Sequence, residues 1–300
     1  MTNATIVPDL YPSRIEPAPG VRDRVDPVVH GRSPGPLTTE QVAEYESEGF
    51  LQVPGVFSRS EVDDILEELA RFTARPEVRA DRRTVVEPAS DEVRSVFEVH
   101  RSNQMLARLA ADERIAGIAR QILDSDVYVH QSRVNFKPAF KGKEFAWHSD
   151  FETWHTEDGM PRMRALSISV SLTYNYTFNG PLMLIPGSQR RYVTCVGETP
   201  DENYLSSLKA QEIGTPDPDS LVRLLEEADG RIAECTGEPG GITVFDCNTM
   251  HGSNSNISPV PRSNVFLVYN SVENVLVEPF SARSRRPEFI AARDFTPVGG

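Results

Sequence analysis

Two histidines and an aspartate are the residues of this sequence best suited to chemistry. His148 and Asp150 stand two residues apart in FAWHSDFETWH, and His251 follows the apolar run GITVFD. On an extended strand, residues i and i+2 point to the same face, so an imidazole nitrogen and a carboxylate oxygen would converge. Two histidines and one carboxylate on one face of an octahedron leave three adjacent positions open, as in non-haem ferrous oxygenases. The spacing therefore predicts an iron centre formed by these three residues.

An arginine after the second histidine supports this interpretation. An isolated H-x-D pair is a weak signal, because it recurs by chance in many sequences. Arg262, however, follows His251 closely and opens the segment RSNVFLVYN. Its planar guanidinium suits bidentate binding of a distal carboxylate, although an arginine after a loop is more often a solvated charge. The neighbouring His155 would face the other side of a regular strand, and His30, His100 and His130 are interpreted as surface or structural residues.

Polar residues alternate along two predicted strands. Gln131, Arg133 and Asn135 lie at every second position of YVHQSRVNFKP, and Ser167 and Ser169 do the same in RALSISVSL. Alternate residues of a strand share a face, and a polar face is costly in a core unless its groups are paired. The pattern fits either a polar cavity for a small molecule or a strand face open to water.

The elements that must position these residues follow a helix-then-strand order. Residues 1–36 are rich in proline and predict an irregular arm that is disordered or wraps the domain formed by residues 37–300. We expect one helix capped by Thr39 and ended by Gly49, and a second capped by Ser60. A strand is expected around 96–100, helices near 104–110 and 114–123, and a short surface helix within 216–229.

From residue 126 onward the chain is dominated by β-branched and aromatic runs broken by Gly, Pro, Asn and Asp. Helices followed by many strands predict a mainly β fold with flanking helices, a jelly roll or β-sandwich. A net charge of −13 argues against nucleic acid and anionic membranes as partners. Three cysteines without a C-x-x-C spacing, and an N-terminus unlike a signal peptide, predict free thiols in a reducing cytoplasm.

Three longer segments are similar to a known family. FAWHSDFETWHTEDGMPRMRALS, NGPLMLIPGSQRR and GGITVFDCNTMHGSNSNISPVPRSNVFLVYNS resemble the ectoine hydroxylases, within the phytanoyl-CoA dioxygenase-like superfamily. The resemblance spans roughly Leu37 to Thr296. It implies a double-stranded β-helix (jelly-roll, cupin-type) core, ferrous iron as the metal, and 2-oxoglutarate and dioxygen as co-substrates. It also implies conversion of ectoine to 5-hydroxyectoine with release of succinate and carbon dioxide, in a cytoplasmic homodimer that serves osmotic stress.

The resemblance also implies roles for individual residues. It places the iron ligands at His148, Asp150 and His251, and the 2-oxoglutarate clamp at Arg262. Further co-substrate contacts match Phe97, Arg133, Asn135, Ser169 and Ser253. Substrate contacts match Gln131, Trp154 and Asn264, a pocket wall matches Ser167, Phe245 and Phe266, and a closing residue from the C-terminal segment matches Arg283.

Two rival functions are compatible with the same residues. The first is a hydroxylase of the same class that acts on another compact, amino-acid-like or zwitterionic substrate. The second is a non-catalytic jelly-roll protein that holds a small solute in the pocket. The intact H-x-D pair, second histidine and arginine argue against the second, because a binding protein has no need for open metal positions.

Overall fold

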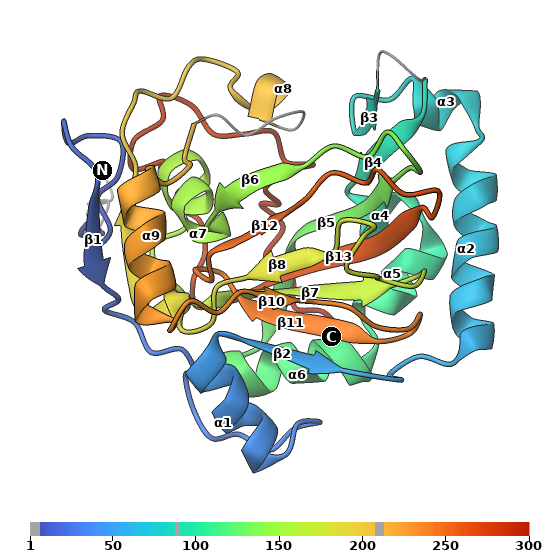
Figure 1. Cartoon of the computed structure of the whole chain (residues 1–300), viewed down its shortest axis with the longest axis horizontal. Coiled ribbons are helices and arrows are strands. Elements are labelled where there is room, and N and C mark those ends of the chain that lie inside the picture. The colour runs from blue at the N-terminus through green and yellow to red at the C-terminus, as the bar shows by residue number, and fades with distance from the viewer. Residues whose placement is uncertain (1–6, 88–90, 208–212, 300) are drawn as a thin grey trace.

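The computed structural model describes residues 7–87, 91–207 and 213–299 of the chain. Two antiparallel sheets face each other in a double-stranded β-helix, or jelly roll (Figure 1). The larger sheet has the strand order β2 (Phe50–Val53), β11 (Ile242–Asp246), β7 (Ala165–Ser171), β13 (Arg262–Ser271), β5 (Val127–Lys137), β4 (Val93–Phe97), β3 (Thr84–Val86). The smaller sheet has the order β10 (Ala233–Glu234), β8 (Leu182–Leu184), β12 (His251–Ser253), β6 (Phe145–His148). The predicted fold class is confirmed.

The register of the larger sheet gathers polar side chains into rows. β13 lies between β5 and β7, and its Phe266 is paired with Arg133 on one side and Ser169 on the other. Two residues earlier in β13, Asn264 is paired with Asn135 of β5. Alternate residues of a strand share a face, so both rows point to the same side of the sheet. That side faces the smaller sheet, because one cavity is lined by residues of both sheets.

Helices cover the opposite face of the larger sheet and enclose the main hydrophobic core. These are α1 (Thr39–Glu48), α2 (Arg59–Thr73), α5 (Gln104–Ala110) and α6 (Glu113–Leu123). Apolar residues of α2 recur at helical spacing and are buried together with the outward-facing residues of β13. Burying one such large side chain contributes about 1.5–3 kcal/mol, so this core fixes the sheet on which the site is built.

The helix starts differ slightly from the sequence-based expectation. Thr38, and not Thr39, caps α1, and Ser58, and not Ser60, caps α2. Both caps are capping boxes, in which the residue three positions later, Gln41 or Glu61, reaches back to the cap backbone. This reciprocal pair of hydrogen bonds selects the earlier hydroxyl in each case. Gly49 ends α1 in the left-handed conformation, as predicted, with φ 82°.

The remaining helices are short. The expected strand around 96–100 ends at Phe97, because Glu98 adopts a left-handed φ of 53° and α4 (Val99–Ser102) follows. The surface helix expected within 216–229 is α9 (Pro218–Glu227). The others are α3 (Pro76–Arg79), α7 (Asp150–Thr153), the π-helix η1 (Trp154–Asp158), the 3-10 helix η2 (Ser188–Arg190) and α8 (Tyr204–Ser207). Among the described residues, no helix combines the length and apolar character needed to cross a membrane.

The described part of the N-terminal arm, residues 7–36, lies along the outside of the jelly roll. Its strand β1 (Gly20–Asp23) pairs antiparallel with β9 (Arg191–Thr194) at the edge near α9 (Figure 1). Farther along the arm, the His30 amide donates to the Ile122 carbonyl of α6 at 2.9 Å. Of the two conformations expected from its prolines, the described residues adopt the one that wraps the domain.

Candidate metal centre

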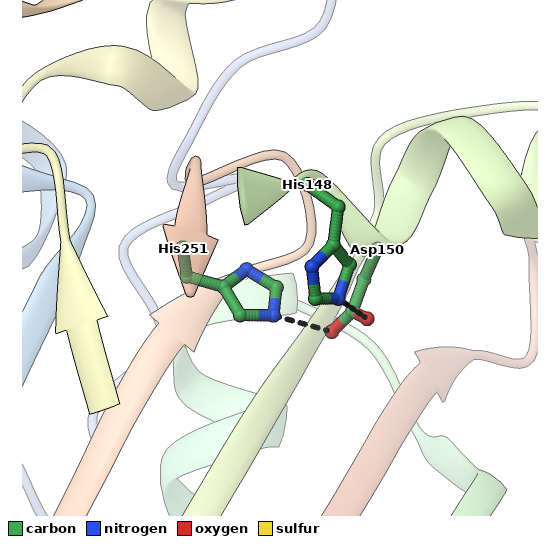
Figure 2. A group of neighbouring side chains, drawn as sticks. All are labelled: His148, Asp150 and His251. Atoms are coloured by element: carbon green, nitrogen blue, oxygen red, sulfur yellow. Dashed lines mark ion pairs between the residues drawn. The ribbon is translucent and has the colours of Figure 1, made fainter. Parts of the chain in front are cut away.

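The side chains of His148, Asp150 and His251 converge on one point inside the jelly roll (Figure 2). Their ligand atoms all lie within 4.8 Å of one another. Nε2 of His148 is 3.7 Å from one Asp150 oxygen, and Nε2 of His251 is 3.9 Å from the other. Two imidazole nitrogens and a carboxylate are the donor set that suits ferrous iron with open positions, so the three residues fit the predicted metal.

Both imidazole rings are oriented by the backbone two residues before them. Nδ1 of His148 is 2.7 Å from the Ala146 carbonyl oxygen, and Nδ1 of His251 is 2.9 Å from the Thr249 carbonyl oxygen. A carbonyl accepts a hydrogen bond only, so each Nδ1 carries the proton and each Nε2 presents its lone pair to the centre. The local chain thus sets both tautomers for metal binding.

Different elements deliver the three ligands. His148 is the last residue of β6 and is directly paired with His251, the first residue of β12. Asp150 does not continue the strand, contrary to the expected extended H-x-D geometry. Ser149 is extended, with φ −104° and ψ 130°, and Asp150 then begins α7. The turn into a helix, and not the two-residue period of a strand, brings the carboxylate beside the imidazoles.

Burial and mutual proximity set the charges of these groups. Burial, reinforced by the neighbouring His251, lowers the pKa of His148 to about 4. Burial alone would raise the pKa of Asp150, but His251, His148 and Arg133 outweigh it and the pKa is lowered. The Ser167 hydroxyl also donates to Asp150 at 3.3 Å. At neutral pH the site therefore holds a neutral His148 and an ionised carboxylate, the protonation states that bind a cation.

Two cavities meet at this cluster and share His148, Arg133 and Asn135 among their lining residues. The first cavity extends toward α7 and η1 and is lined by predicted substrate and co-substrate residues, namely Gln131, Trp154 and Phe97. The second extends between the two sheets toward β13 and is lined by His251, Ser253, Arg262 and Phe266. The site thus has two sides, one on each flank of the metal cluster.

The other predicted residues fall into two groups. Four of them, Ser167, Ser169, Phe245 and Asn264, lie next to the metal cluster or in the polar rows of the larger sheet but do not line either cavity. The Asn264 amide donates to Ser169 at 2.8 Å, and the ring of Phe245 lies 5.1 Å from that of His251. Ser167, as described above, donates to Asp150. Arg283 stands apart, because it is exposed on the C-terminal segment and lies outside the residues that line the two cavities.

The second cavity is strongly cationic. Arg262 is buried, its Nη1 donates to Asn264 at 3.3 Å, and its Nε has no hydrogen-bond partner among the described residues. Burial lowers its pKa to about 10, so the guanidinium remains charged at neutral pH. Burying a cation with an unsatisfied hydrogen-bond donor costs free energy unless an anion pairs with the charge and accepts the hydrogen bond. The cavity therefore fits the carboxylate of a 2-oxo acid.

Lys137 is a cavity residue that the sequence-based prediction missed. Its Nζ donates to the Ser253 hydroxyl at 2.9 Å and to the Asn254 carbonyl at 2.6 Å, inside the second cavity. Burial, followed by the charge of Arg262, lowers its pKa to about 7. The alternation through Gln131, Arg133 and Asn135 continues to Lys137, so the signal for it was present in the sequence.

Arg286 is the residue that the C-terminal segment contributes to the lining of the first cavity. It is buried, lines that cavity, and binds Asp158 through Nε at 2.7 Å and through Nη2 at 2.5 Å. Nε2 of His130 lies 3.5 Å from the same carboxylate. The C-terminal segment thus closes the cavity through an ion pair to η1, three residues beyond the exposed Arg283. Arg286 was not predicted, because its partner Asp158 lies far away in the sequence.

A jelly roll with two histidines and one carboxylate, flanked by a cationic cavity, defines a non-haem iron- and 2-oxoglutarate-dependent dioxygenase. Residues 45–264 match the family model described as phytanoyl-CoA dioxygenase (PhyH), and the chain belongs to this family.

Individual relatives give a more detailed comparison. A protein of Streptomyces avermitilis named ectoine dioxygenase is 54% identical, over 98% of this chain and 99% of its own. Two crystal structures of EctD from S. alaskensis, one with bound Fe and one with 2-oxoglutarate and 5-hydroxyectoine, are each similar with a TM-score of 0.87. Each is 46% identical and covers 97% of both chains. The family resemblance predicted from the sequence is confirmed.

Proposed function

We propose that this protein hydroxylates ectoine to 5-hydroxyectoine. One atom of dioxygen enters the substrate as a hydroxyl group and the other enters succinate, as 2-oxoglutarate loses carbon dioxide. The observation that carries the proposal is the convergence of His148, Asp150 and His251 between a cationic cavity and an aromatic one. The relatives named ectoine dioxygenase identify the substrate.

In this proposal the metal supplies the oxidation and the chain supplies geometry. Ferrous iron, when bound with 2-oxoglutarate, activates dioxygen for insertion into a C–H bond. His148, Asp150 and His251 hold the metal on one face. Arg262 and Ser253 would hold the far carboxylate of 2-oxoglutarate in the second cavity. Arg133, Asn135 and Ser169 would be further contacts, and Phe97 would contact the co-substrate from the first cavity. Holding both reactants in fixed relation is the main contribution that a protein can make to such a reaction.

Ectoine combines a delocalised cyclic cation with a carboxylate, and the first cavity offers groups for both. Trp154 is buried and its ring lies 5.2 Å from that of His130 at 68°, which fixes the indole for stacking on a cation. The Gln131 amide nitrogen donates to the Ile290 carbonyl at 2.8 Å, while its oxygen accepts from Arg133 at 3.3 Å. Gln131 therefore presents a defined polar edge. The other residues assigned to the substrate lie beside this cavity: Ser167 and Phe245 contact Asp150 and His251, Asn264 contacts Ser169, and Phe266 lines the second cavity. Arg283, also assigned, is exposed on the C-terminal segment.

The decisive experiment is anaerobic reconstitution with ferrous iron, followed by oxygen, 2-oxoglutarate and ectoine. Equal amounts of 5-hydroxyectoine and succinate are expected. Succinate without 5-hydroxyectoine would retain the iron chemistry and reject ectoine as substrate, and other zwitterionic solutes would then be screened by mass spectrometry. If iron is bound and neither product forms, the result would favour a solute-binding protein.

We also propose that the chain forms a homodimer and functions in the cytoplasm. Tyr174, Tyr176 and Phe178 are exposed and stacked, with successive ring centroids 5.6 and 4.9 Å apart, and such apolar surface is typical of protein contacts. Light scattering should give twice the chain mass for the wild type and less for Tyr176→Ser/Phe178→Ser. The three cysteines are free and buried, which suits a reducing compartment, and fractionation of cells tests the location.

A further inference from the structure

Two arginines of the N-terminal arm are buried in the body of the protein. The side chain of Arg14 is 0% exposed and that of Arg24 is 3% exposed, whereas Arg22 on the same arm is 43% exposed. Arginine is almost never buried unless it is paired. Each buried arginine pairs with a carboxylate in a segment that carries a proposed iron ligand.

Arg14 binds the helical segment that begins at Asp150. Its Nε and Nη2 donate to the two oxygens of Glu152 at 2.9 and 2.6 Å, and its Nη1 donates to Glu157 at 2.6 Å. Glu152 lies two residues after Asp150 in α7, and Glu157 lies in η1 and lines the first cavity. A Cβ on Gly214 would overlap Arg14 Nη2, so backbone covers this bidentate pair. The arm therefore fixes the helical turn that delivers the carboxylate ligand.

Arg24 binds the strand end that leads to His251. Its Nη1 donates to Asp246, the last residue of β11, at 2.7 Å, and its Nη2 donates to the Met163 carbonyl at 2.9 Å. The same oxygen of Asp246 accepts a hydrogen bond from the backbone amide of Asn248 at 2.8 Å. Asp246 thus sets the turn between β11 and β12, and Arg24 compensates its buried charge.

The two segments are also joined directly. The Ser149 hydroxyl donates to the Asn248 side chain at 3.0 Å, and the Phe151 amide donates to the Cys247 carbonyl at 2.8 Å. These bonds connect the residues around Asp150 with the turn before His251. The arm binds both sides of this junction, one arginine on each side.

We infer that the N-terminal arm is part of the machinery that positions the metal ligands, with Arg14 holding the Asp150 segment and Arg24 holding the His251 segment. This inference rests on the proposed iron site. Both arginines are positioning residues, since neither side chain contacts the ligands themselves. Groups that hydrogen-bond directly to metal ligands change metal affinity by about 10- to 100-fold when removed, and these two arginines act one contact farther from the metal.

The test compares Arg14→Met and Arg24→Met with Arg22→Met in the full-length chain. Arg22 is the matched control, because it belongs to the same arm and pairs with the exposed Glu16. Anaerobic titration with Co²⁺ alone, followed by its visible absorption, measures metal affinity without turnover. We expect affinity to fall about 10-fold for both test variants, the lower end of the range for groups that contact a ligand directly, and the control to stay within about twofold of the wild type. Folded test variants with wild-type affinity would overturn the inference.

Arg14→Lys and Arg24→Lys cover the case in which a methionine variant does not fold. Lysine retains the charge but cannot bind both oxygens of a carboxylate in a planar fork, so intermediate metal affinity is expected. Wild-type affinity in both lysine variants, with unfolded methionine variants, would assign a purely structural role and reject the inference. Because Co²⁺ binding is measured without substrate, a failure of ectoine hydroxylation in the wild type is a separate result.

Discussion

At the scale of single residues, the metal cluster depends on how each ligand is held. Both histidines present Nε2 because a backbone carbonyl accepts from Nδ1. Asp150 is held less tightly, because its side chain accepts a hydrogen bond from the Ser167 hydroxyl at the longer distance of 3.3 Å. Its ionisation depends mainly on the charges around it. Of the three ligands, Asp150 is therefore the one whose substitution should weaken metal binding with the least effect on folding.

We expect Asp150→Ala to reduce hydroxylation by about 100-fold or more, because loss of a ligand exceeds the 10- to 100-fold effect of losing an outer group. Thermal unfolding should still show a folded protein, because the side chain of Asp150 makes only a 3.3 Å hydrogen bond, with Ser167, among the described residues. The control is Asp64→Ala, an exposed position on α2. Product formation by mass spectrometry measures the effect, and full activity in Asp150→Ala would contradict the ligand assignment.

Lys137 predicts a pH dependence of co-substrate binding. Its pKa is about 7 before an anion binds, because burial and the charges of Arg262 and Arg94 outweigh the opposing charge of Glu144. A bound dianion favours the charged amine and raises this pKa, so binding takes up a proton. Affinity for 2-oxoglutarate should therefore fall as pH rises above about 7, by at most about tenfold per pH unit.

Calorimetry of the metal-loaded, oxygen-free protein measures this proton uptake directly from the dependence of the heat on the buffer. Lys137→Met should bind 2-oxoglutarate more weakly at pH 6.5 to about 7.5 and lose the pH dependence. The exposed Lys143 supplies the control, as Lys143→Met. An unchanged pH profile in Lys137→Met would show that another group titrates.

At the scale of secondary-structure elements, local pattern predicted most of the fold. Alternation predicted that Arg133 shares a face of its strand with Gln131 and Asn135, and that Ser169 shares a face of another strand with Ser167. Only the register with β13, where both pair with Phe266, places the two sets side by side. Helical spacing predicted α2, although the cap was two residues off because the capping box at Ser58 decides the start. The turn of Asp150 into α7 was not predicted, because tertiary contacts to the Cys247 segment stabilise this short helix.

The end of η1 gives a test at this scale. Gly159 has φ 80°, and a Cβ there would overlap the carbonyl oxygen of Val277 in the C-terminal segment. Gly55 also has a positive φ, 65°, but a Cβ there would meet nothing within 4 Å. Gly55→Ala should cost about 1–2 kcal/mol of unfolding free energy from left-handed backbone strain alone. Gly159→Ala should cost about 2–5 kcal/mol, because backbone must also move.

Urea unfolding at 25 °C measures both free energies. Equal losses in the two variants would mean that the C-terminal segment moves aside freely. In that case its contact with η1 would contribute little to closing the first cavity.

At the scale of the whole molecule, distant parts of the chain meet around the metal cluster. The arm contributes Arg14 and Arg24, and the C-terminal segment contributes Arg286 through Asp158. These buried ion pairs join segments far apart in sequence, so no local pattern identifies their partners. The division of the chain at residue 36 stays a prediction, and the buried arginines show that the arm packs as closely as the domain.

Metal binding should therefore stabilise the whole molecule. Any ligand that binds only the folded state adds free energy, about 2.7 kcal/mol at 100 times its dissociation constant. For a chain of 300 residues the unfolding entropy is about 0.6 kcal/mol/K, so Tm should rise by about 4 °C with Fe²⁺ under anaerobic conditions. The net charge of −13 also attracts any divalent cation weakly, so Mg²⁺ at the same concentration is the control. In His251→Ala, Fe²⁺ should shift Tm no more than Mg²⁺ does; a retained shift of about 4 °C would place the stabilising metal elsewhere.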